Sequence, residues 1–181
     1  MTTASDLIAN MQPGTMWSLD GDRSSITFRN KTLWGLATVK GTFSELEGAG
    51  EIKAEQAIAG HLRIGTASVS TGIGKRDEHL RSADFFDVEG HPAITVDVHG
   101  VKATGADSVE LDVTLTIRET ERRLDVPAKV TRLDDGSLRI TAHTDVNRKD
   151  FGVDGNLMGM IPETVVLDGD AVFTSVAGDS F

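Results

Sequence analysis

The chain has 181 residues, of which 39% are hydrophobic and 25% are charged, a composition typical of one soluble globular domain. Its formal net charge of -10 disfavours binding to nucleic acid or to an anionic lipid surface, because both repel an acidic protein. The absence of cysteine excludes disulfide bonds, thiolate metal sites and thiol catalysis. We therefore expect a partner that is not a polyanion.

The N-terminal residues 1–13 are expected to form a tail or a short helical plug ahead of a single domain over residues 14–181. The first residues lack a basic region, and their one apolar run, Leu7-Ile8-Ala9, is too brief for the core of a signal peptide. No stretch approaches the ~18 apolar residues of a membrane-spanning helix. The sequence therefore predicts a cytoplasmic protein without stable membrane insertion.

Apolar and polar residues alternate along the rest of the chain, which predicts β-strands with one buried face. Two strands are predicted around residues 25–28 and 37–43. A third covers residues 62–69, where the parity of the apolar positions changes near Gly65 and predicts a β-bulge. The clearest strand is Val109–Ile117, in which the alternation is unbroken. Further strands are predicted at residues 94–98, 124–130, 138–142 and 165–173.

Turn-forming residues at 48–50, 104–107 and 134–136 predict hairpins and hence an antiparallel meander. Residues 76–87 lack the period of two and predict a short helical insertion, which Pro92 ends. About eight strands, each apolar on one face, must cover that face and leave no open edge. A closed antiparallel β-barrel does both, so the predicted fold class is all-β.

The interior of a barrel of ~8 strands is either filled by its own side chains or holds one small ligand. Periodicity alone leaves both alternatives open, so the inward-facing residues either line a ligand-binding site or form a solid core. These candidate ligand-binding residues are Phe28, Val39, Phe43, Ile64, Val69, Val96, Leu111, Val113, Leu115, Val126, Ile140 and Phe173.

The most specific sequence signal is the segment Ser70–Asp87, which reads STGIGKRDEHLRSADFFD and is followed by Pro92-Ala93-Ile94. Four further segments accompany it in a fixed order, namely Gly14–Asp20, Val39–Phe43, Leu115–Ile117 and Arg148–Gly152. With these segments the chain resembles the YceI family of polyisoprenoid-binding proteins. The resemblance implies a lipocalin-like barrel whose apolar interior holds an isoprenoid or fatty chain, with no required cofactor and no established catalytic activity. The chain departs from the family at Arg23, where a histidine is usual, and at Glu119, where a glycine is usual.

The cluster Arg76, Asp77 and His79 is a candidate for contact with a ligand head group at the barrel mouth. Arginine binds phosphate groups with two parallel hydrogen bonds, and histidine titrates near neutral pH. The alternative is structural: Arg76 and Asp77 fix the short helix while neighbouring apolar side chains plug the barrel end.

The segment Gly152–Pro162 combines glycines with methionines, and it predicts either a lid over the pocket or an ordinary surface loop. The other histidines, at positions 61, 91, 99 and 143, lack the spacing of metal ligands. The motifs of common hydrolases and nucleotide-binding proteins are also missing from the sequence. We therefore predict no catalytic residues and no metal site.

Three functional hypotheses follow from the sequence. The first is non-enzymatic binding, storage or transport of an elongated apolar ligand, such as an isoprenoid or a quinone-type lipid. The second is an enzyme that acts on such a lipid through Arg76, Asp77 and His79. The third is a solid-cored interaction module or homodimer, for which Trp34 and Leu36 would supply the exposed apolar surface.

Overall fold

The computed structural model describes residues 2–32, 36–54, 57–156 and 161–176. The strands are β1 (Met16–Leu19), β2 (Ser25–Thr32), β3 (Ala37–Phe43), β4 (Leu46–Ile52), β5 (Ile58–Gly65), β6 (Val69–Ser70), β7 (Ala93–Ala103), β8 (Ser108–Ile117), β9 (Thr120–Arg132), β10 (Leu138–Asn147) and β11 (Thr164–Val176). The helices are α1 (Ala4–Ala9) and α2 (Gly74–Arg81), and the 3-10 turns are η1 (Gly21–Arg23), η4 (Thr66–Ser68) and η5 (Arg148–Phe151).

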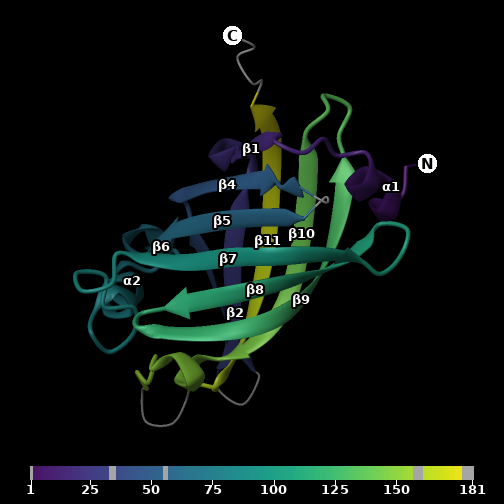
Figure 1. Cartoon of the computed structure of the whole chain (residues 1–181). Helices are drawn as coiled ribbons and strands as arrows, with labels where there is room; N and C mark the ends of the chain where they lie inside the picture. Colours follow the sequence, from purple (N-terminus) through teal and green to yellow (C-terminus); the bar gives the residue numbers. More distant parts are fainter. Residues whose placement is uncertain (1, 33–35, 55–56, 157–160, 177–181) are drawn as a thin grey trace.

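Eight strands of the described chain close into an antiparallel barrel. The ring runs β1-β4-β5-β7-β8-β9-β10-β11, and β1 closes it by pairing with both β4 and β11. Strands β2, β3 and β6 continue the sheet from the other half of β11. Figure 1 shows α1 and α2 at opposite ends of this barrel. The predicted fold class is confirmed, because the ring leaves each strand's apolar face turned toward a common interior.

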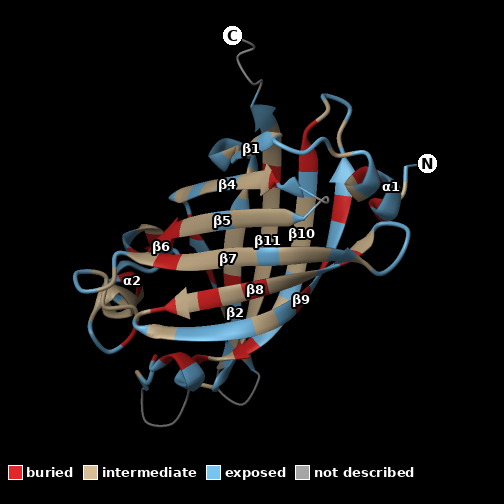
Figure 2. Cartoon of the chain, in the orientation of Figure 1, coloured by how far each residue is buried: buried red, intermediate tan, exposed pale blue. Residues whose placement is uncertain are grey.

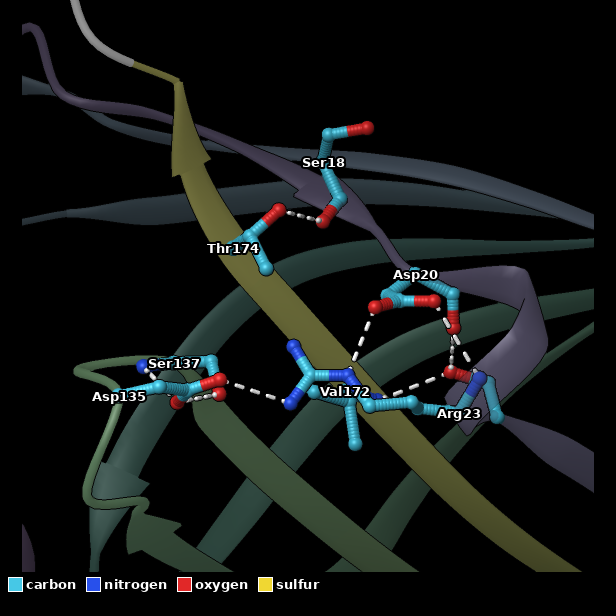
Figure 3. A network of polar contacts seen from close by, with 8 residues as sticks. Ser18, Asp20, Arg23, Asp135, Ser137, Val172 and Thr174 are labelled. Atoms are coloured by element: carbon cyan, nitrogen blue, oxygen red, sulfur yellow. Dashed lines mark hydrogen bonds and ion pairs between the residues drawn. The ribbon is translucent and has the colours of Figure 1, made fainter.

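Strands β1 and β2 act as one long strand that η1 interrupts, since both pair with β11. Next to η1, where the chain passes from β1 to β2 along β11, Arg23 donates a hydrogen bond to Asp20 (2.7 Å) and another to Asp135 (2.8 Å) in the turn between β9 and β10. The backbone and hydroxyl of Ser137 donate to the same Asp135 carboxylate at 2.9 and 2.5 Å. Figure 3 shows this network crossing β11. Arg23 therefore links η1 to the turn between β9 and β10.

Two local predictions were wrong, and both concern glycine. Residues 48–50 do not form a turn but lie within β4, where Gly48 pairs with Leu62 of β5. A Cβ atom at Gly48 would lie 3.1 Å from the His61 carbonyl and 3.3 Å from Leu19 Cβ, so glycine permits a close approach there. Near Gly65 the parity changes through the 3-10 turn η4 and not through a bulge; the bulge lies in β7, between Val98 and Gly100.

The other connections follow the sequence. Turns occur at residues 104–107 and 134–136, as predicted, and α2 is the short helix expected near residues 76–87. After α2 the chain forms successive turns up to β7. The backbone nitrogens of Phe86 and Val88 donate hydrogen bonds to the carbonyls of Leu80 and Arg81, so these turns fold back against the helix.

Buried side chains gather in two clusters, one at each end of the barrel. We call the end closed by α2, its following turns and η5 the α2 end, and the end closed by α1 the α1 end. The α2-end cluster consists of Phe28, Phe43, Ile64, Val69, Phe85, Ile94, Leu115, Ile117, Val146, Phe151 and Val153. The α1-end cluster consists of Ala4, Leu7, Val109, Ala128 and Val130. Figure 2 shows that most of the strand surface between these ends is only partly buried.

Candidate ligand cavity

The barrel encloses a cavity of about 630 Å³ that extends from side chains of α1 to side chains of α2. This volume lies within the range of about 300–1,000 Å³ that is usual for small-molecule sites. Most of the wall side chains are aliphatic or aromatic. The barrel is therefore hollow, which resolves the alternative that periodicity left open.

The structure places eleven of the twelve predicted inward residues on the cavity wall. They are Phe28, Val39, Phe43, Ile64, Val96, Leu111, Val113, Leu115, Val126, Ile140 and Phe173. Val69 does not border the cavity and is fully buried, with 0% of its surface exposed. Its two-residue strand lies beneath Arg81, which donates a hydrogen bond to the Val69 carbonyl. Contact of the eleven residues with a ligand remains a prediction.

Three aromatic rings shape the wall near the α2 end. The ring centroids of Phe28, Phe43 and Phe86 lie between 5.6 and 6.3 Å apart, in tilted or edge-on arrangements. The Phe28 ring lies directly over Gly41, because a Cβ atom at Gly41 would come within 2.2 Å of Phe28 Cζ. Glycine at this position therefore lets the Phe28 ring lie close to the sheet and keeps space open above it.

Further wall residues were absent from the predicted ligand-binding set. They include Leu7, Ile8 and Met11 from the N-terminal segment, Trp17 from β1, and Leu80, Phe85, Phe86, Val153 and Ile161 from the segments that close the α2 end, where Leu80, Phe85 and Phe86 are the apolar side chains predicted to plug the barrel. The spacing of Leu7, Ile8 and Met11 fits one face of a helix and was the signal that could have revealed the first group. The last group lies outside regular strands, where alternation carries no information.

Arg76 and Asp77 serve mainly to hold the loop before α2. Asp77, only 6% exposed, accepts hydrogen bonds from the Thr71 backbone nitrogen (2.8 Å) and hydroxyl (2.5 Å). The Thr71 hydroxyl is the main reason why the pKa of Asp77 lies below its ordinary value. Arg76 donates to the Thr71 hydroxyl (2.7 Å) and carbonyl (3.2 Å). These contacts match the structural alternative for this pair.

The three residues of this cluster differ in their access to the cavity. Arg76 and His79 border the cavity, whereas Asp77 does not. His79 Nε2 lies 3.0 Å from an Asp84 carboxylate oxygen, and its ring is perpendicular to the Phe85 ring with centroids 5.0 Å apart. The trio therefore does not converge on one point of the cavity, and Arg76 and His79 remain the candidates for contact with a head group.

A buried arginine that the sequence analysis overlooked closes the α2 end. Arg148 is 6% exposed, and it donates hydrogen bonds at 2.6–3.1 Å to four backbone carbonyls. These carbonyls belong to Val153, Gly155, Ile161 and Pro162. Arg148 therefore fixes both flanks of the predicted lid segment to η5. Residues 157–160 of that segment lie outside the described residues.

The charge of Arg148 has no ion-pair partner within the described part of the chain, although Asp154 and Glu163 favour its charged form from farther away. Burial is the largest effect, and it lowers the pKa of Arg148. Arg148 borders the cavity, as does Asn30, whose amide nitrogen donates to the same Pro162 carbonyl at 3.3 Å. Asn30 Oδ1 is buried and has no hydrogen-bond partner among the described residues. The α2 end of the cavity thus offers a cation and a free acceptor.

No group of three or more histidine, aspartate or glutamate side chains in the described ranges is arranged to hold a metal ion. Among the helices that the structure describes, none has the length and apolar character required to cross a membrane.

Eight antiparallel strands closed around an apolar cavity define a lipocalin-like β-barrel. Within that class the chain belongs to the YceI family, because the model of the YceI-like domain matches residues 17–173.

Curated relatives carry the name UPF0312 protein. One from Azotobacter vinelandii is 30% identical over 112 residues, which is 61% of this chain and 58% of the relative, so the match spans less than two thirds of that relative's length. One from Pseudomonas aeruginosa is 31% identical over 141 residues, or 74% of this chain and 73% of the relative.

Solved structures share the fold at low sequence identity. BcnA of Burkholderia cenocepacia superposes with a TM-score of 0.78 at 18% identity, covering 86% of this chain and 99% of BcnA. A polyisoprenoid binding domain from Saccharophagus degradans superposes with a TM-score of 0.74 at 22% identity, covering 88% of this chain and 98% of that domain.

Proposed function

We propose that this protein binds one elongated apolar molecule, an isoprenoid or a quinone-type lipid, inside the barrel and stores or carries it without transforming it. The observation that carries the proposal is the cavity of about 630 Å³, whose mainly apolar wall runs from the α1 end to the α2 end. The membership of the YceI family and the fold shared with a polyisoprenoid binding domain support it.

The energetics favour a reversible carrier. Burying a hydrocarbon chain stabilises the complex by about 0.8 kcal/mol per CH₂ group relative to water. Lipid tails in a membrane are as apolar as the cavity wall, so capture from a membrane gains little from burial alone. Shape, head-group contacts and access then decide the affinity.

The distribution of polar groups supports one orientation of the ligand. Arg76, His79, Arg148 and Asn30 all border the α2 end of the cavity, so a polar or anionic head group belongs there. Toward α1 the lining residues are mainly apolar, with Glu51 of β4 and Trp17 of β1 as exceptions; the Trp17 indole nitrogen is buried and unpaired among the described residues. The hydrocarbon tail therefore extends toward α1.

The two other hypotheses lose specific support. An enzyme built on Arg76, Asp77 and His79 needs all three at the cavity, yet Asp77 is separated from it and bonded to Thr71. The interaction module assumed a solid core, whereas the barrel is hollow. Leu36 is exposed at 86% of its surface, and Trp34, its proposed companion, lies outside the described residues.

The direct test is native mass spectrometry of the protein purified from its own host, followed by organic extraction and identification of the released molecule. We expect a stoichiometric species with a prenyl chain. A ligand-free mass under gentle conditions, together with no binding of added prenyl alcohols, would contradict the proposal.

A substitution that fills the cavity sharpens this test. Ala142 of β10 borders the cavity beside Gly169, its partner in β11. Both residues are small, so they leave room at this level of the barrel. The change Ala142→Phe should reduce binding of farnesol at least about tenfold, because the new ring occupies the space of the chain. Thr131→Phe, at an exposed position of β9, is the matched control and should leave binding unchanged. Equal affinity of both variants would argue against the interior as the binding site.

A further inference from the structure

The helix α1 contributes to the cavity although it precedes the range that the family model matches. The family match begins at residue 17, whereas α1 spans Ala4–Ala9. Nevertheless Leu7, Ile8 and Met11 form part of the cavity wall. The end of the cavity is thus built partly from a segment that the family match does not include.

The amphipathic pattern of this segment explains its position. Ala4 and Leu7, which are 1% and 6% exposed, pack against Val109, Ala128 and Val130 of the barrel. Ile8 packs on the same cluster from a partly buried position. Ala4, Leu7, Ile8 and Met11 follow the spacing of one helical face, which lies over the open end of the barrel.

Polar contacts position the start of α1. The side chains of Thr3 and Asp6 form a capping box that begins the helix. The backbone nitrogen of Ala4 donates a hydrogen bond to the Ala106 carbonyl in the turn between β7 and β8. A helix of six residues is not stable alone in water, so its position depends on the apolar side chains that it lays against the barrel.

We propose that α1 and Met11, which follows it, form the end wall that limits the length of the chain the cavity accepts, with Leu7, Ile8 and Met11 as the specificity-determining residues. The inference rests on the proposed function and on the orientation given above. With the head group held by polar side chains at the α2 end, the tail reaches the α1 end. The side chains of α1 set the distance between the two ends that is available to the chain.

Substitutions at Ile8 and Met11 test this role in both directions. Ile8→Ala and Met11→Ala shorten wall side chains and lengthen the cavity, whereas Ile8→Trp shortens it. Ser5→Ala, on the exposed side of the same helix, is the matched control. The probes are geraniol, farnesol, geranylgeraniol and solanesol, prenyl alcohols of increasing length, added to the full chain and measured by native mass spectrometry.

We expect wild-type affinity to rise with chain length up to a limit and then to fall. The alanine variants should bind the first alcohol beyond that limit about tenfold more tightly than wild type, since less than two newly buried CH₂ groups suffice for this change. Ile8→Trp should move the limit toward shorter alcohols, and Ser5→Ala should leave it in place. Circular dichroism of each variant establishes that the barrel is folded.

The outcomes separate this inference from the proposed function. If wild type and all variants bind the alcohols with one common length limit, the barrel binds prenyl chains and the role of α1 is overturned. If the folded wild type binds none of the alcohols, the proposed function fails and the length limit fails with it. A limit that moves in opposite directions in Ile8→Ala and Ile8→Trp supports the end wall.

Discussion

The two ends of the barrel are closed in different ways. The α2 end is closed by buried charged side chains that bind backbone atoms, with Arg148 donating to four carbonyls and Asp77 accepting two bonds from Thr71. The α1 end is closed by apolar side chains of one short helix, and the Ala4 backbone nitrogen at the start of that helix donates a hydrogen bond to the Ala106 carbonyl. Hydrogen bonds hold groups at fixed distances and angles, whereas apolar contacts tolerate changes of shape.

This difference agrees with how the family domain is distributed along the chain. The residues that close the α2 end, from Thr71 to Arg148, all lie within the matched range 17–173. The helix that closes the α1 end lies outside it. A fixed end suits the recognition of a head group, and an end closed by apolar contacts suits a tail whose length can differ between proteins.

The largest loss of stability is expected from a substitution of Arg148. The change Arg148→Met should lower the free energy of unfolding by about 3 kcal/mol, because it removes the arginine donors from four carbonyls, of which only that of Pro162 keeps a second donor, Asn30, among the hydrogen bonds described above. Urea denaturation measures this loss. Arg122→Met, at an exposed arginine that donates to the Glu121 carbonyl, should change it by less than about 0.5 kcal/mol. Equal effects of the two changes would show that Arg148 does not hold the α2 end.

A substitution at the α1 end should destabilise the protein less. Leu7→Ala removes a buried side chain from the apolar cluster and should lower the free energy of unfolding by about 2 kcal/mol, at the low end for such truncations because α1 can shift into the space. Hydrogen exchange should become faster in α1 and stay unchanged in η5. Faster exchange at both ends would show that the two closures are coupled, contrary to the comparison.

Two glycines provide a steric comparison of the ends: Gly41 lies beneath the Phe28 ring, and Gly50 lies on the cavity wall. Gly41→Ala should destabilise the protein by about 1.5 kcal/mol and weaken ligand binding, because the new Cβ displaces the Phe28 ring toward the cavity. Gly50→Ala, in β4 toward the α1 end, should be tolerated, since its Cβ would lie 3.6 Å from the Ala59 carbonyl and 3.8 Å from Trp17 Cβ. Thermal unfolding and farnesol binding measure both effects. A Gly50→Ala variant as damaged as Gly41→Ala would contradict this geometry.

The smallest change in stability is expected from lowering the pH. The Ser137 hydroxyl and backbone, aided by Arg23, lower the pKa of Asp135 from 3.8 to about 2. A carboxyl whose pKa is lower in the folded state stabilises the fold above pH 3.8, and this contribution is lost as the pH falls toward about 2. The pKa of Asp77 is also lowered in the folded protein, so its carboxylate likewise stabilises the fold, and this contribution is lost in acid.

Thermal unfolding between neutral pH and about pH 2 measures this dependence. Asp135→Asn should flatten the acid limb of the curve slightly, because Asp135 is exposed and its interactions are weakened by solvent. Asp77→Asn should flatten it more, since Asp77 is buried. The reverse order would contradict the assignment of the stronger polar closure to the α2 end.

Much of the fold was predictable because strand parity is a local property. In Val109–Ile117 each apolar residue predicted to face inward does so, and Val113 and Leu115 lie on the cavity wall. Glycine was ambiguous, since it serves both turns and close approaches between strands. The local sequence around Gly48 could not reveal that Leu19 and His61 lie against it, because those contacts come from other strands.

The sequence alone determined the antiparallel barrel, the family and eleven of the wall residues, because alternation and motif order are written along the chain. Only the tertiary structure decided that the barrel is hollow, that α1 forms one end wall and that Arg148 closes the other end. Alternation specifies the direction of each side chain but not the space left between side chains. A cavity is the difference between the volume that the ring of strands encloses and the volume that its side chains occupy, and both depend on contacts between distant segments.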